Sequence, residues 1–101
     1  MSYKIRTLDK ANRELVKALQ WYMNQQEGLE NEFIEQFEKD AKAISIHPES
    51  YPLVKKDFRQ APMTKFPYVI VIVYSIQRKE EAVDIVSIFH TSRSPKQKFR
   101  K

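Results

Sequence analysis

Two stretches in the first half of the chain place apolar residues at the spacing of amphipathic helices. The inward positions of the first are Ala11, Leu15, Ala18, Leu19 and Tyr22, and those of the second are Leu29, Phe33, Phe37, Ala41 and Ile44. The first helix begins near Thr7 or Asp9, because either side chain can cap it. Gly28, the only glycine, suits the turn between the helices, and Pro48 and Pro52 end the second helix. Since neither helix can bury its stripe alone, we predict a helical hairpin packed on a sheet.

Outside these helices the pattern changes to the two-residue period of β-strands. Residues 3–7 predict a short first strand, 54–59 a second, 66–76 a third and 82–90 a fourth. A loop at 60–65 and a charged turn at 77–81 separate the last three strands. The predicted fold class is therefore α+β with the order β-α-α-β-β-β, in which the helical hairpin covers one face of a small, mainly antiparallel sheet.

The third predicted strand is apolar on both faces, which favours a central place in the sheet. Two helices can cover only one face of a sheet. We therefore expect part of the other face to be exposed in the isolated chain, where a partner segment that folds on binding would cover it.

Length, composition and charge narrow the class of protein. The 101 residues are expected to form one domain, 1–101, with no apolar run long enough for a signal peptide or membrane helix and no cysteine, so we expect a cytoplasmic protein. The first 92 residues carry 13 basic and 13 acidic side chains, whereas the tail from Arg93 onward carries five basic and none acidic. Such a tail attracts phosphates or acidic partners, or is simply a solvated end, and charge alone leaves both open.

Most enzyme signatures are missing from the sequence. A single glycine leaves no phosphate-cradling loop, and His47 and His90 lack metal-ligand spacing, so we predict no cofactor and no metal site. What remains is a group near the end of the last strand, His90 and Arg93, which Arg59 could join from a neighbouring strand. Arginine and histidine together suit phosphate binding and proton transfer. The alternative is that His90 ends a strand and the arginines are solvated.

Five short patterns, in this order along almost the whole chain, resemble toxins of the RelE/ParE superfamily and its ParE-like members in particular. They are A-x-x-E-L-x-x-A-x-x-W-Y from Ala11 to Tyr22, G-L-x-x-x-F from Gly28 to Phe33, I-x-x-x-P from Ile44 to Pro48, F-P-Y from Phe66 to Tyr68 after Arg59, and I-F-H-T-S-R-S-P from Ile88 to Pro95. The resemblance implies the toxin of a type II toxin–antitoxin, or plasmid stabilization, system. Its partner would be a cognate antitoxin, in a heterotetramer, or a second copy in a homodimer.

The resemblance also implies two alternative targets. ParE-like members are associated with poisoning DNA gyrase, whereas RelE-like members cut messenger RNA in the ribosomal A site without a metal. We favour the gyrase inhibitor, which is not an enzyme, and keep the metal-independent endoribonuclease as the alternative.

The resemblance carries over to particular residues. Arg59, Arg93 and His90 match positions where RNA-cutting members place basic residues, and they are the catalytic candidates if the chain is an endoribonuclease. The candidates for binding a target or nucleic acid come from the residues themselves and not from the resemblance: they are Lys65 at the boundary of a predicted strand and Lys96, Lys98, Phe99 and Arg100 of the basic tail. RNA-cutting members often end in tyrosine where this chain has phenylalanine, which lacks a hydroxyl, and this difference favours the inhibitor.

Overall fold

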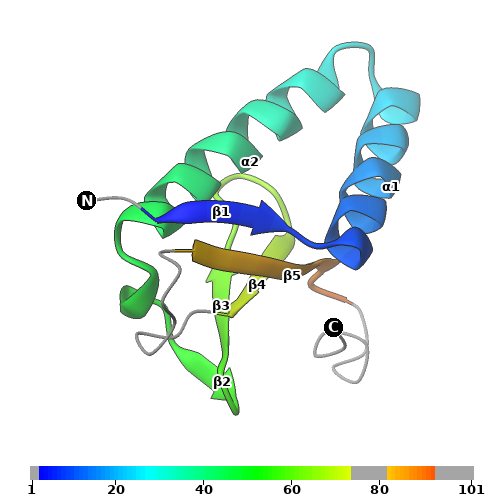
Figure 1. The fold of residues 1–101 in the computed structure, drawn as a ribbon. Coiled ribbons are helices and arrows are strands. Elements are labelled where there is room, and N and C mark those ends of the chain that lie inside the picture. Colours follow the sequence, from blue (N-terminus) through cyan, green and yellow to red (C-terminus); the bar gives the residue numbers. More distant parts are fainter. Residues whose placement is uncertain (1–2, 74–81, 93–101) are drawn as a thin grey trace.

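The computed structural model describes residues 3–73 and 82–92. Its elements are β1 (Lys4–Thr7), α1 (Asp9–Gln25), α2 (Leu29–Ile46), the short 3-10 helix η1 (Pro48–Ser50), β2 (Leu53–Lys55), β3 (Phe58–Pro62), β4 (Tyr68–Val73) and β5 (Ala82–His90). Figure 1 shows the helical hairpin of α1 and α2 beside a single sheet. The predicted α+β class is confirmed. The predicted turn at 77–81 and the end of the third predicted strand lie outside the described residues.

The five strands form one sheet in the order β1-β5-β4-β3-β2. All neighbouring pairs are antiparallel except β1 and β5, which run parallel. The strand that is apolar on both faces, β4, lies in the middle, as predicted. β1 can run parallel to β5 because the two strands are far apart in the sequence and no short turn has to join them.

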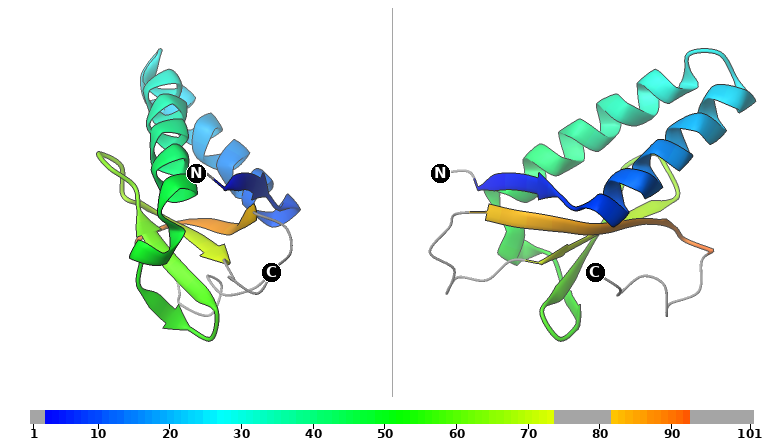
Figure 2. Two further views of the ribbon diagram at one scale, coloured as in Figure 1. Left: turned by 60° about the vertical axis from the view of Figure 1, so that its left-hand side comes forward. Right: turned by 45° about the vertical axis from the view of Figure 1, so that its right-hand side comes forward.

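Both helices pack on one face of the sheet, as Figure 2 shows in its right-hand view. The buried core between the layers combines the predicted helical stripes with alternate residues of β3, β4 and β5. Its members are Ala11, Ala18, Tyr22, Phe33, Phe37, Ile44, Ala61, Met63, Ile70, Ile72, Val83, Ile85 and Ile88. The predicted core positions of both helices are therefore confirmed, with Leu15, Leu19, Leu29 and Ala41 partly buried at its margin.

The opposite face of the sheet has an apolar cluster of its own. It consists of Phe58, Val69, Val71, Val73, Val86 and Phe89, with Leu8 packed against it. None of the six is more than 8% exposed. The expectation that this face is exposed is therefore wrong for the described residues. Leu8, which precedes α1, packs against this cluster and contributes to its burial.

The start of α1 differs from the prediction. Leu8 occupies the N-cap position and no side chain caps the helix, so neither Thr7 nor Asp9 acts as the cap. Leu8 donates its backbone N–H to the carbonyl of Ile85 and packs its side chain into the apolar cluster of the opposite face. The start of α1 is thus set by the backbone hydrogen bond to β5 and by the burial of Leu8, and not by a capping side chain. Gly28 has a φ of 89° in the turn between the helices, the left-handed conformation for which a glycine is suited.

The second predicted strand and the loop after it also need correction. Residues 54–59 are not one strand, because Lys56, with a φ of 50°, turns the chain between β2 and β3. The strand β3 then continues through Pro62, which had been expected in a loop. Pro62 pairs with Val69 of β4, but β2 pairs only with Phe58 and Arg59, so proline removes no hydrogen bond on the outer side.

Candidate functional site

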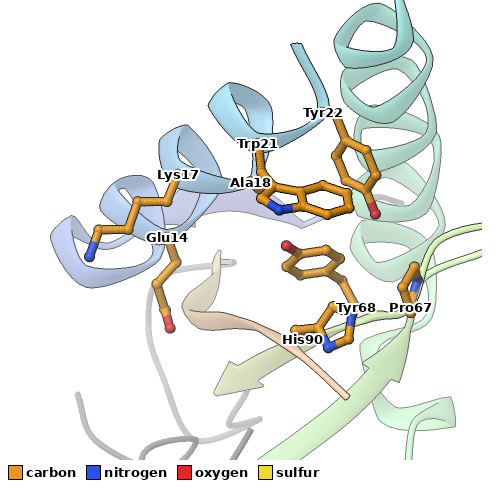
Figure 3. A pocket seen from close by; sticks show the side chains of 8 residues that line it. All are labelled: Glu14, Lys17, Ala18, Trp21, Tyr22, Pro67, Tyr68 and His90. Carbon is orange, nitrogen blue, oxygen red and sulfur yellow. The ribbon is translucent and has the colours of Figure 1, made fainter. Parts of the chain in front are cut away.

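A cavity of about 370 Å³ opens between α1 and the end of the β4–β5 pair. It is lined by Glu14, Lys17, Ala18, Trp21, Tyr22, Pro67, Tyr68 and His90. Figure 3 shows Trp21 and Tyr22 reaching down from α1 toward Tyr68, with His90 and Pro67 on the sheet side. Most of this lining is aromatic or apolar, and the polar groups are few, which is the usual composition of a binding site.

Aromatic side chains form the helix side of the cavity. Tyr22 is buried, stacks on Phe33 at 5.1 Å between ring centroids and meets Trp21 edge-on at 5.0 Å. Burial raises the pKa of the Tyr22 hydroxyl, and Tyr68 adds to this. By contrast, Trp21 is 54% exposed although it is the largest apolar side chain in the protein. The sequence pattern put both residues in one motif, but only Tyr22 belongs to the core.

A β-bulge brings His90 to the cavity. Val71 of β4 pairs with Ser87 and the next residue, Ile72, pairs with Ile85, so Val86 has no partner opposite it. The side chains of a strand alternate between faces, and one extra residue reverses the alternation beyond it. Ile85 faces the helices before the bulge, and Ile88 and His90 face them after it. Without Val86 as the extra residue, His90 would lie on the opposite face of the sheet.

Glu14 of α1 accepts hydrogen bonds from two polar groups next to the bulge. One oxygen of its carboxylate accepts hydrogen bonds from the Ser87 hydroxyl at 2.9 Å and from the Ile88 backbone N–H at 3.1 Å. At this point β1 has already ended, since its last pair joins Thr7 to Ile85. The Glu14 side chain therefore accepts a hydrogen bond from β5 at a point that β1 does not reach.

We expect Glu14→Ala to lower the free energy of unfolding by about 1–3 kcal/mol, because it leaves the buried Ser87 hydroxyl and Ile88 N–H without this acceptor. Glu14→Gln should lose less, since its amide oxygen can still accept. Urea denaturation of both variants measures the difference. Equal losses in the two variants would show that the acceptor does not matter.

His90 is held in one tautomer. Its Nδ1 accepts the backbone N–H of Ser92 at 3.2 Å and lies 2.8 Å from the Ser92 hydroxyl. A backbone N–H can only donate, so Nδ1 carries no proton and the neutral ring bears its hydrogen on Nε2. The ring meets Tyr68 edge-on at 5.3 Å. In this arrangement His90 offers the cavity a neutral hydrogen-bond donor.

The structure separates Arg59, the other catalytic candidate among the described residues, from His90. Arg59 pairs with Ile72, whereas His90 pairs with Tyr68, four residues away along β4. At about 3.3 Å per residue, the two pairs lie about 13 Å apart along the strands. The Arg59 guanidinium donates to the backbone carbonyls of Tyr51 at 2.7 Å and Glu49 at 3.3 Å, so it ties η1 and the following turn to the sheet.

Lys65 also lies away from His90. It has a φ of 73° in the loop between β3 and β4 and lines a second cavity of about 290 Å³ against α2, together with Glu32 and Lys39. The remaining predicted site residues, Arg93, Lys96, Lys98, Phe99 and Arg100, lie outside the described residues. Of the candidates that are described, only His90 belongs to the main cavity.

Four residues that line this cavity were not predicted as site residues from the sequence: Glu14, Lys17, Trp21 and Tyr68. A signal for Trp21 was present, since the helical spacing places it off the buried stripe of α1 where a tryptophan is unusual. No comparable signal existed for Tyr68, because its alternation within the strand fits a core position equally well.

Two further observations concern the described part of the chain. In residues 3–73 and 82–92, no three His, Asp or Glu side chains gather closely enough to hold a metal ion. Neither α1 nor α2 combines the length and the apolar character that crossing a membrane requires.

Two solved structures share the fold of this chain. The fold is shared with a solved structure described as a chromosomal ParDE toxin–antitoxin system from P. aeruginosa, with a TM-score of 0.72 and 12% identity over 90% of this chain and 98% of that chain. It is also shared with the toxin–antitoxin complex RelBE2 from Mycobacterium tuberculosis, with a TM-score of 0.59 and 17% identity over 89% and 99%. A comparison with curated protein sequences found no match.

The family follows from the sequence itself. Residues 5–95 match the model of the ParE toxin of the type II toxin–antitoxin system parDE. This match covers nearly the whole chain, and the protein belongs to the ParE toxin family.

Proposed function

We propose that this ParE-family toxin acts by binding its target, DNA gyrase, and that a cognate antitoxin neutralises it. Family membership and the likeness to two solved toxin–antitoxin systems support the module. The gyrase target is inferred from the ParE-like character of the sequence patterns. Gyrase and antitoxin both work in the cytoplasm, and we propose the same compartment for this chain.

The single observation that favours binding over RNA cleavage is the separation of Arg59 from His90. Metal-free RNA cleavage needs a group that moves protons and a cation that stabilises the phosphate, both at the same bond. The pairs that contain these two residues are about 13 Å apart along the strands, and the Arg59 guanidinium already donates to two backbone carbonyls. A cavity lined mainly by aromatic and apolar side chains suits the recognition of a protein surface.

The test compares two biochemical assays on the purified protein. We expect supercoiling by purified gyrase to fall as the protein is added, while messenger RNA on programmed ribosomes stays intact. Specific A-site cuts by the wild-type chain that disappear in His90→Ala would overturn the proposal and establish the endoribonuclease instead. Met23→Ala serves as the control, because Met23 is exposed outside the cavity and its substitution should change neither assay.

A further inference from the structure

Two lysines adopt a backbone conformation that residues other than glycine rarely take. Lys56 has a φ of 50° in the turn between β2 and β3, and Lys65 has a φ of 73° in the loop between β3 and β4. Within residues 3–73 and 82–92 they are the only non-glycine residues with a positive φ. Both are exposed, and neither forms an ion pair with another described residue. Such a conformation costs a lysine free energy that a glycine does not lose, and residues held in it cluster at functional surfaces.

Lys56 belongs to an exposed hairpin at the edge of the sheet. Val54 of the edge strand β2 is 42% exposed, and Lys56 and Asp57 form the turn that follows. The backbone N–H of Gln60 donates to the carbonyl of Pro52 at 3.1 Å and holds the base of this hairpin. Figure 1 shows β2 and its turn projecting from the sheet on the side away from the helices. Residues 53–57, here named the β2–β3 hairpin, thus present an apolar side chain, a cation and an anion on a fixed projection.

Lys65 lines the second cavity, of about 290 Å³, between α2 and the loop from β3 to β4. The lining combines apolar side chains with charges of both signs, and its main members are Leu29, Phe66, Glu32, Glu35, Lys39 and Lys65. Asp40 of α2 fixes the loop by accepting the backbone N–H of Thr64 at 3.0 Å and its hydroxyl at 3.2 Å. This α2 cavity is therefore a preformed site for an apolar group flanked by opposite charges.

The β2–β3 hairpin and the α2 cavity are complementary to each other. Glu35 and Lys39 lie one turn apart on α2, about 6 Å between their Cβ atoms. Lys56 and Asp57 are neighbours in the turn and offer the reverse pair of charges. The hairpin cannot reach the cavity of its own chain, because the turn precedes β3 and the loop follows it, and five strand residues span about 17 Å. A second copy of the chain, however, carries the matching surface.

We propose that two copies of this chain pair antiparallel, with the β2–β3 hairpin of each seated in the α2 cavity of the other. Two equal contacts about a twofold axis close the dimer. In each contact Lys56 faces Glu35 of the partner copy, and Asp57 faces Lys39 and Lys65. Val54 packs against Leu29 and Phe66 of the partner copy. This inference goes beyond the proposed function and involves neither gyrase nor an antitoxin.

Sedimentation velocity of the purified full-length protein measures the association directly. We expect a monomer–dimer equilibrium with a dissociation constant of about 10–100 µM, the range of small, transient interfaces. Raising the NaCl concentration from about 0.05 M to about 0.5 M should weaken dimerisation by about fivefold or more, because exposed charge pairs are screened.

Charge reversal locates the contact. Lys56→Glu and Glu35→Lys should each weaken dimerisation by about tenfold or more, and the double variant should return to within about threefold of the wild-type chain, because the reversed charges attract again. Val54→Asp should weaken it as strongly by placing a carboxylate against apolar side chains. Leu53→Asp, on the opposite face of β2, and Lys42→Glu, on α2 outside the cavity, are the matched controls. Both should dimerise like the wild-type chain.

Lys56→Gly separates loss of the contact from loss of the fold. Glycine takes the left-handed conformation without strain, so the urea midpoint of this variant should be at least that of the wild-type chain. The midpoint is measured at a concentration where the wild-type chain is monomeric. Dimerisation of Lys56→Gly should nevertheless weaken by about tenfold, because the cation is missing.

The outcomes decide the inference without reference to the proposed function. A chain that stays monomeric up to about 1 mM, species that grow beyond a dimer, or a double variant that does not recover would each overturn it. Recovery in the double variant together with unchanged controls would establish the contact. Because the protein is measured alone, a failure to inhibit supercoiling would refute the proposed function and leave this result standing.

Discussion

Phe33→Ala is expected to lower the free energy of unfolding by about 3–5 kcal/mol. Phe33 is fully buried and its ring lies within 5.0–5.4 Å of Tyr22, Phe66 and Tyr68. It therefore joins α2 to the aromatic wall of the cavity, and alanine would leave a void that its neighbours can fill only in part. Domains of this kind are stable by about 5–15 kcal/mol in total, so this single change removes a large share.

Urea denaturation measures this loss, as a lower midpoint at an unchanged slope. The matched control is Met23→Ala, which removes an exposed side chain and should change stability by no more than about 0.5 kcal/mol. Phe33→Leu keeps most of the apolar volume and should fall between the two. A loss below about 1 kcal/mol for Phe33→Ala would mean that the core around this ring is loosely packed.

Phe89→Ala should lower the free energy of unfolding by a similar amount, about 3–5 kcal/mol, although neither α1 nor α2 covers its side of the sheet. Phe89 is 1% exposed and packs with Phe58 and Val69 in the apolar cluster of the opposite face. If that cluster is a second core, deleting the ring opens a cavity. If water reached this face, the same substitution would remove little buried surface.

The measurement for Phe89→Ala is again the unfolding midpoint, with the isolated protein and without a partner. Leu53→Ala is the matched control, because Leu53 is a large apolar side chain on the edge strand β2 that is 55% exposed. A loss for Phe89→Ala as small as that for Leu53→Ala would restore the original expectation of an exposed second face.

Periodic patterns in the sequence determined the elements of this fold. The helical stripes predicted α1, α2 and their buried residues, and the two-sided apolar pattern predicted that β4 is central. These inferences worked because side-chain periodicity is a local property that directly reports which face of an element is buried. The hairpin between β2 and β3 was missed, since a turn of Lys56 and Asp57 carries no glycine or proline to mark it.

The candidate site depended instead on contacts between distant parts of the chain. The sequence singled out His90, but not the bulge at Val86 that turns it toward the helices, nor Glu14, 74 residues before Ile88, which accepts the backbone N–H there. It also grouped Arg59 with His90, and the strand register separates them. Periodicity in a sequence thus determined the elements and their apolar faces, whereas only the tertiary structure decided the register and the bulge. The physical reason is that a one-residue shift between paired strands leaves local composition unchanged and yet moves every later side chain to the other face.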